Sequence, residues 1–409
     1  MMVKSLKFFG VILLLIIIAV GLFVFNTVSQ YEKMCDGDLD MSISIDTIPF
    51  TYSASGHILI HAKINESEKE YGFILDSGAS SHVFSNLQKE IQLENNGFGL
   101  GLNSSGKYFF SRIKKVKSIR IGDFKFLNFN ADQSDFNVDC VEDVYGIIGI
   151  GLMRHLVWNI DFEKRLIMVS RDIKNFIFKE NRIEIPLEEN QFSHHLSTYI
   201  NFRKKRSSTT VTVDLGNSGN LSLRESDILF DSIDFRSSKI FGRGSTGLGD
   251  DKKRLSEEKY YLLDTMYLEP SKHFVNDFQV KSSPDGLNLL GLGFFRNYKT
   301  TISWFDQKLV LEPYGETENS IYYDFGFHTR YDKDEKKAFV NTIVENSPAA
   351  KLNIPLHSEV ISINGITMND LNAYCEYKLA RASEDSITLK VKHEDSIKNF
   401  VVRKEYLFN

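Results

Sequence analysis

The sequence contains an internal duplication, which leaves few possible folds for the chain. The first copy opens with Ile48–Phe50 and the second with Ile185–Leu187, and each then runs through strand-like alternation into an aspartate, Asp76 or Asp214. The interval from the proline of each opening to that aspartate differs between the copies by a single position. Landmarks that recur in the same order predict one supersecondary unit used twice.

A glycine-rich segment follows each aspartate at a similar distance. Gly149 is the middle glycine of the first segment, and Gly291 holds the corresponding place after Asp214. Short β-branched and aromatic runs, separated by Gly, Asn, Asp and Ser, dominate both copies. We therefore expect a mainly β, bilobal domain with pseudo-twofold symmetry. Its halves are residues 41–172 and 180–313.

The N-terminus predicts a membrane anchor within residues 1–30. Phe8–Phe25 contains no charge and no proline, and as a helix it nearly spans the hydrocarbon core of a bilayer. Lys4 and Lys7 precede it, so we expect a cytoplasmic stub, with everything after about Asn26 on the extracytoplasmic side. A cleaved signal peptide is the alternative, although the apolar run exceeds the usual h-region of roughly 7 to 15 residues.

Length, charge and the spacing of cysteines and histidines limit the partners and cofactors that this chain can have. The 409 residues predict two to three domains, and a net charge of -5 offers no basic field for nucleic acid. Cys35, Cys140 and Cys375 are too scattered to suggest a disulfide framework, so we expect buried or free thiols. His194 and His195 are adjacent and cannot both face one side of a strand, and no set of histidines has metal-ligand spacing. We expect neither a metal nor a cofactor.

The two aspartates are the candidate catalytic residues. Hydrolysis of an amide without a metal needs one group to take a proton and another to give one, and two facing carboxylates that share a proton can do both. Asp76 and Asp214 each follow a buried-looking strand, and Gly78 and Gly216 permit tight turns whose N–H groups can point at the carboxylate. A duplicated fold brings such equivalent turns together.

The two halves resemble the retropepsin and pepsin clan of aspartic peptidases. The resemblance covers about residues 41–313, and its motifs are Ile74–Ala79, Gly146–Gly151 and their second-half counterparts. It implies peptide-bond hydrolysis by a water activated between Asp76 and Asp214, without metal or cofactor. It also implies that Gly146–Gly151 and Asn288–Gly293 wrap the catalytic turns. The positions that it assigns to support of the dyad are Ser77, Gly78, Ala79, Gly216 and Asn217.

One position departs from the family. The family places Thr or Ser after each aspartate, and these hydroxyls interlock across the twofold axis; Ser77 conforms, but Leu215 can neither donate nor accept. Either the dyad works with altered rigidity, or the second half has drifted toward a structural role. The family also closes glycine-rich flaps over its substrate. Gly97–Gly106 and Gly242–Gly249 are the candidates here, with ordinary flexible hairpins as the alternative.

The C-terminal residues 320–405 resemble a PDZ domain. The resemblance rests on three segments: Tyr323–Phe327, Phe339–Ala350 with its Ser-Pro-Ala-Ala motif, and Val360–Gly365 with its Ile-Asn-Gly motif. A helix is expected near Asn369–Ala382.

A PDZ domain binds extended peptides, often through a terminal carboxylate held by backbone N–H groups. The resemblance assigns that loop to Phe325, Gly326 and Phe327. Asp324 replaces the usual glycine, and an acidic residue there would repel a carboxylate. A purely structural lid or spacer is the alternative.

Together these patterns predict a membrane-anchored aspartic endopeptidase that acts on protein or peptide substrates. The bulk of the chain would lie on the extracytoplasmic side of the membrane, in the periplasm or at the cell surface. Its PDZ domain would bind a peptide or control access. The alternative is a non-catalytic peptide-binding protein with a degenerate aspartic-peptidase fold.

Overall fold

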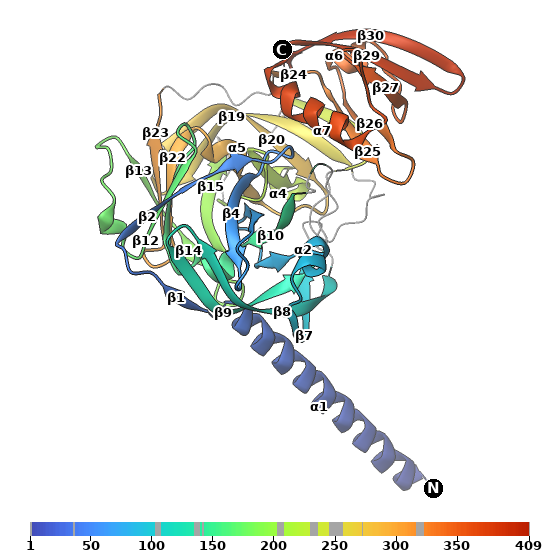
Figure 1. Cartoon of the computed structure of the whole chain (residues 1–409). Helices are drawn as coiled ribbons and strands as arrows, with labels where there is room; N and C mark the ends of the chain where they lie inside the picture. Colours follow the sequence, from blue (N-terminus) through green and yellow to red (C-terminus); the bar gives the residue numbers. More distant parts are fainter. Residues whose placement is uncertain are drawn as a thin grey trace.

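The protein is mainly β, with one long helix at its N-terminus (Figure 1). This computed structural model describes residues 2–35, 37–102, 108–134, 140, 143–202, 208–229, 236–244, 257–271, 273–315 and 323–408. The mainly β expectation and the N-terminal apolar helix are confirmed.

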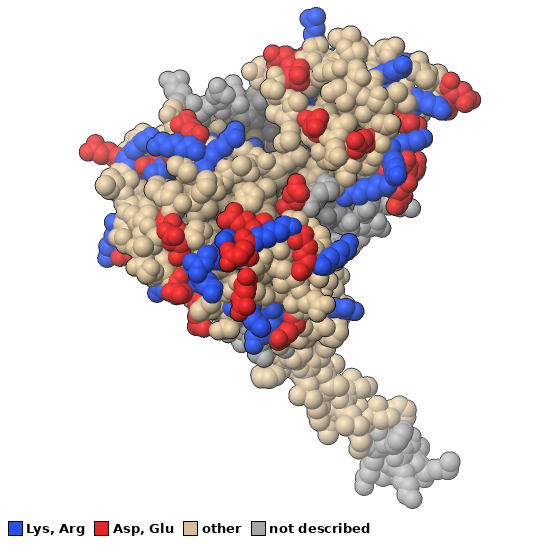
Figure 2. All heavy atoms as spheres, viewed as in Figure 1, with Lys and Arg blue, Asp and Glu red and all other residues tan. Residues whose placement is uncertain are grey.

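Helix α1 (Met2–Cys35) projects from the β-rich body. Its segment Phe9–Asn26 is long and apolar enough to cross a membrane, and no other helix of the described residues meets that test. Its large apolar side chains are exposed, and Figure 2 shows this stretch bare of Lys, Arg, Asp and Glu. Such a surface suits lipid rather than water.

The first half forms a nine-stranded sheet in which the order of neighbours is β1-β9-β6-β10-β5-β4-β8-β7, with β3 beside β4. Strand β5 leads directly to Asp76 and pairs antiparallel with β4 and parallel with β10. The strands are β1 (Asp38–Asp40), β3 (Thr51–Tyr52), β4 (Ile58–Ile64), β5 (Glu70–Leu75), β6 (His82–Val83), β7 (Glu94–Leu102), β8 (Tyr108–Ile121), β9 (Phe124–Gln133) and β10 (Val144–Ile148).

The second half repeats this pairing. Strand β16 ends at Asp214 and pairs antiparallel with β15 and parallel with β21. The strands of this half are β14 (Glu188–Glu189), β15 (Leu196–Phe202), β16 (Thr209–Asp214), β17 (Leu221–Arg224), β18 (Arg236–Gly242), β19 (Glu258–Glu269), β20 (His273–Ser283) and β21 (Leu289–Gly291). Short helices α2 (Ser85–Glu90), α3 (Ile150–Met153), α4 (Glu225–Leu229) and α5 (Leu292–Phe295) and the 3-10 turn η1 (Ile173–Asn175) complete the two halves.

A six-stranded sheet joins the halves, in the order β13-β23-β22-β11-β12-β2. At its centre β11 pairs with β22, with Trp158 opposite Ile302. One apolar core runs through both halves and includes both tryptophans, Trp158 and Trp304. The halves therefore fold around a common interior. The strands are β2 (Ile45–Pro49), β11 (Val157–Asp161), β12 (Leu166–Ser170), β13 (Ile183–Pro186), β22 (Tyr298–Ser303) and β23 (Lys308–Pro313).

The C-terminal part has a separate apolar core, yet its sheet is continuous with that of the second half. Strand β26 pairs with β18, with Phe241 opposite Ile343. This part lies at the end of the body away from α1 (Figure 1). Its elements are β24 (Tyr323–Asp324), β25 (Phe327–Asp332), β26 (Lys337–Val344), α6 (Pro348–Lys351), β27 (Glu359–Ile363), β28 (Ile366–Thr367), α7 (Leu371–Ala380), η2 (Arg381–Ser383), β29 (Ser386–His393), β30 (Ser396–Arg403) and β31 (Glu405–Tyr406).

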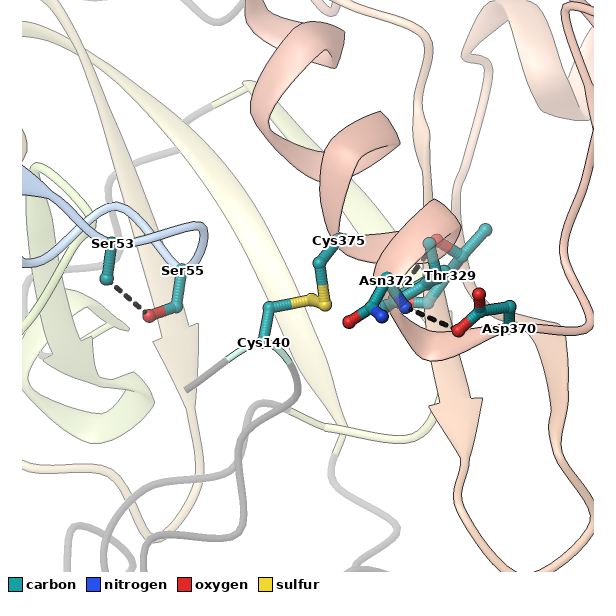
Figure 3. The surroundings of a disulfide bond; sticks show 8 residues. Ser53, Ser55, Cys140, Thr329, Asp370, Asn372 and Cys375 are labelled. Atoms are coloured by element: carbon teal, nitrogen blue, oxygen red, sulfur yellow. Dashed lines mark hydrogen bonds between the residues drawn. A yellow bond between two sulfur atoms is a disulfide. The ribbon is translucent and has the colours of Figure 1, made fainter. Parts of the chain in front are cut away.

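The expectation of free or buried thiols is wrong for two of the three cysteines. Cys140 of the first half and Cys375 of α7 form a disulfide across a sequence separation of 235 residues (Figure 3). The pattern of cysteines along the chain gives no sign of this bond, because only the tertiary fold places Cys140 against the apolar core of the C-terminal part, within reach of α7. The C-terminal part is thus held to the second half by strand pairing and to the first half by a covalent bond.

Candidate active site

The two turns that carry Asp76 and Asp214 meet at the floor of a cleft. Asp76 follows β5 and Asp214 ends β16, and their side chains hydrogen-bond to each other. A cavity of about 1090 Å³ opens above them and is lined by residues of both turns. The predicted pair therefore lies within hydrogen-bonding distance, although the two aspartates come from different halves of the chain.

Backbone N–H groups hold each carboxylate in its turn. Gly78 donates to Asp76 Oδ1 at 2.7 Å, while Gly216 and Asn217 donate to Asp214 Oδ1 at 2.8 and 3.0 Å. These bonds favour the charged form and fix the orientation of each carboxyl group.

The glycine of each turn also packs against the opposite aspartate. A Cβ on Gly78 would collide with the Asp214 carboxyl group, and a Cβ on Gly216 would collide with that of Asp76. Both positions therefore require glycine for close approach rather than for an unusual backbone angle. A displacement of one turn would displace the carboxylate of the other.

The two aspartates differ in electrostatics. Burial raises the pKa of both, but hydrogen bonds from Gly78 and Asp214 partly offset the rise at Asp76. Burial and then the negative charge of Asp76 raise the pKa of Asp214 well above its ordinary value. Two carboxyl groups this close cannot both ionise, so they share one proton.

Ser77 bridges the two turns. Its hydroxyl donates to Val213 O at 2.8 Å and accepts from Leu215 N–H at 3.0 Å, and the side chain is buried. The Leu215 side chain is also buried and packs in the common core. The interlock across the axis is thus present from one side only, as the departure at Leu215 predicts.

Ala79 and Asn217 occupy equivalent places, three residues after their aspartates. The carbonyl of Ala79 accepts from Ile150 N–H at 2.9 Å, and that of Asn217 accepts from Leu292 N–H at 2.7 Å. These bonds tie each turn to the glycine-rich segment that the resemblance assigns to it. In addition, Asp76 N–H donates to Ile148 O at 3.0 Å.

The two flap candidates differ. Gly97–Gly101 lies on β7, which pairs with β8, and Leu100, Gly101 and Phe109 line the cavity. Gly242 of β18 pairs with Thr342 of the C-terminal part instead of standing free. The tips of both candidates, including Gly106 and Gly249, lie outside the described residues.

In the C-terminal loop assigned to peptide binding, the backbone groups of Gly326 and Phe327 already have hydrogen-bond partners within the protein. Phe325 and Phe327 are buried, and Gly326 N–H donates to Asp324 Oδ1 at 2.8 Å. Arg381 pairs with Asp324 at 2.9 Å and donates to Phe327 O at 2.7 Å. The Asp324 carboxylate therefore takes the kind of contact that a bound carboxylate would take. Asp324 also lines the cavity above the dyad.

Four described histidines line the cavity and were not among the predicted site residues, namely His57, His82, His195 and His328. His57 and His195 lie beside the turns that carry the two aspartates, and each precedes the aspartate of its own half by the same interval. This equal spacing is a signal that a comparison of the two copies could have found. Within the described ranges, no three His, Cys, Asp or Glu side chains are grouped as metal ligands.

Comparisons with known proteins add no assignment. No protein-family model matches the chain, and no curated protein matches it.

Proposed function

We propose that this protein is a membrane-anchored aspartic endopeptidase. The observation that carries the proposal is the pair Asp76 and Asp214, two hydrogen-bonded carboxyl groups from equivalent turns at the floor of a large cleft. Two facing buried carboxyl groups lower the stability of a fold, because burial raises the free energy of their charged form. Such a pair is therefore more typical of a functional site than of a structural one.

The proposed chemistry uses the single proton that the two aspartates share, with Asp76 assigned as the ionised member of the pair. Ionised Asp76 takes a proton from a water molecule, whose oxygen then bonds to the scissile carbonyl carbon, while protonated Asp214 donates a hydrogen bond to the carbonyl oxygen. The resulting tetrahedral intermediate collapses as the C–N bond breaks and the amine nitrogen receives a proton from the dyad. The backbone N–H groups of the two turns keep the carboxylates oriented throughout.

The family and the location are part of the same proposal. The halves are proposed to be retropepsin and pepsin-like and the C-terminal part PDZ-like, with this part controlling access or holding peptide beside the cleft. Residues of both parts line one cavity, which supports that arrangement. The Cys140–Cys375 disulfide supports an extracytoplasmic location, because such bonds persist in oxidising compartments.

The test is cleavage of an unfolded protein by the full chain in detergent micelles, between pH 3 and 7. We expect Asp76→Asn and Asp214→Asn each to lower the rate by at least about 100-fold, the scale of general acid-base catalysis. The matched control is Asp306→Asn, an exposed turn carboxylate that accepts from Ser303 at 2.6 Å, which should retain full activity. Cleavage unaffected by Asp76→Asn would contradict the proposal.

A non-catalytic peptide-binding protein is the second candidate, and the one-sided interlock at Leu215 favours it. It predicts that the wild-type chain binds extended peptides in the cleft and leaves them intact at every pH.

A further inference from the structure

The histidines His57 and His195 occupy equivalent places in the two halves. His57 directly precedes β4, the neighbour of the strand that leads to Asp76, and His195 directly precedes β15, the neighbour of the strand that ends at Asp214. Both are the last residue of a turn whose backbone closes in the same way. Ser53 N–H donates to His57 O, and Asn190 N–H donates to His195 O, each at 2.9 Å.

Each ring reaches across the pseudo-twofold axis to the opposite catalytic turn. His195 Nε2 contacts Gly78 O at 2.9 Å, and the ring of His57 hydrogen-bonds to the backbone of Gly216. The partner of His195 is a carbonyl oxygen, which can only accept, so the imidazole of His195 is the donor. Burial lowers the pKa of His57, but the hydrogen bond with Gly216 acts to raise it, as expected when the ring donates. The two glycines are those that pack against the opposite carboxylates.

The surroundings keep both rings neutral. Burial lowers the pKa of both histidines, to about 4 for His57. A neutral imidazole carries one N–H. The Ser55 hydroxyl lies 2.8 Å from His57 Nδ1 and is hydrogen-bonded in turn to Ser53 (Figure 3), so it can donate to Nδ1 and leave the proton on Nε2.

We propose that His57 and His195 are a matched pair of positioning residues that hold the two catalytic turns in register across the pseudo-twofold axis. The pair adds two bonds across the axis where the Ser77 interlock works from one side only. Because Gly78 and Gly216 each touch the opposite carboxylate, fixing their carbonyls fixes the separation of Asp76 and Asp214. The role in catalysis rests on the proposed function, whereas the two hydrogen bonds do not.

The test compares Leu and Gln at each position, because the amide nitrogen of Gln can replace Nε2 as a neutral donor. A misplacement of about 1 Å in a catalytic geometry costs on the order of 100-fold in rate. We therefore expect His195→Leu and His57→Leu to lower kcat by about 10- to 100-fold with KM within about threefold. His195→Gln and His57→Gln should recover kcat to within about threefold of wild type. The control is His61→Leu on the strand that follows His57, whose side chain is exposed and should leave kcat unchanged.

Three outcomes would overturn the pairing. The first is full kcat in the Leu variants, and the second is a rise in KM alone, which would mean that the rings contact substrate instead. The third is a loss in the Gln variants equal to that in the Leu variants while thermal unfolding is unchanged.

A measurement independent of activity separates this inference from the proposed function. Full chain labelled with ¹⁵N-histidine should show His57 and His195 as neutral Nε2–H tautomers whose protons exchange slowly at pH 7. Rapid exchange of both protons would refute the pair even if the enzyme is active. Slow exchange in a wild-type chain that cleaves nothing would support the pair and refute the peptidase.

Discussion

Replacing Ser77 by alanine should strongly destabilise the common core of the two halves. The buried hydroxyl satisfies two backbone groups of the other half, Val213 O at 2.8 Å and Leu215 N–H at 3.0 Å. Alanine leaves both without their partner, and an unsatisfied buried polar group costs about 1–3 kcal/mol. We therefore expect Ser77→Ala to lower the free energy of unfolding by about 2–6 kcal/mol, a large share of the stability of an ordinary domain.

Urea unfolding of the full chain, followed by tryptophan fluorescence, measures this loss. Both tryptophans of the chain, Trp158 and Trp304, are buried in the core that the halves share, so the signal reports on that core. With a urea slope of about 3 kcal/mol/M, the midpoint should fall by about 1 M. Ser77→Thr keeps the hydroxyl and should stay within about 1 kcal/mol of wild type, the worth of a single hydrogen bond. A loss in Ser77→Ala no larger than that of an ordinary surface substitution, about 0.5 kcal/mol, would refute the argument that this hydroxyl holds the two turns together.

Three further predictions follow from the site and the disulfide. Because the folded-state pKa of Asp214 is raised, its burial costs stability as pH rises above the ordinary carboxyl range. Asp214→Asn should therefore stabilise the protein at pH 7, and calorimetry should show that gain vanish below about pH 4. Cys375→Ser removes the disulfide bond to Cys140, and the chain entropy that this bond restricts sets the loss of stability at up to about 5 kcal/mol. Hydrogen exchange of α7 should be faster in this variant than in the wild type only under non-reducing conditions, because a reductant breaks the same bond in the wild type. Asp324→Ala frees Gly326 N–H, which can then donate to the terminal carboxylate of a peptide. Fluorescence anisotropy should show that this variant binds a peptide with a free C-terminus at least about tenfold more tightly than the amidated form of the same peptide.

The mainly β character and the N-terminal apolar helix could be predicted from the sequence alone, and the structure has both. Both follow from local patterns, strand-like alternation in one case and an uncharged apolar run in the other. The duplication also allowed the pairing of two distant residues to be predicted, because one axis relates equivalent positions of a repeated unit. That is why Asp76 and Asp214 could be named as a pair before any coordinates, while their catalytic role stays a prediction.

Other contacts between groups far apart in the sequence could not be predicted and become visible only in the folded chain. The Cys140–Cys375 bond forms because Cys140 packs against the apolar core of the C-terminal part. His57 and His195 each contact a turn of the other half. Residues far apart in sequence leave no mark of such proximity in the local pattern, because that pattern records burial and backbone preference but not the identity of the neighbour.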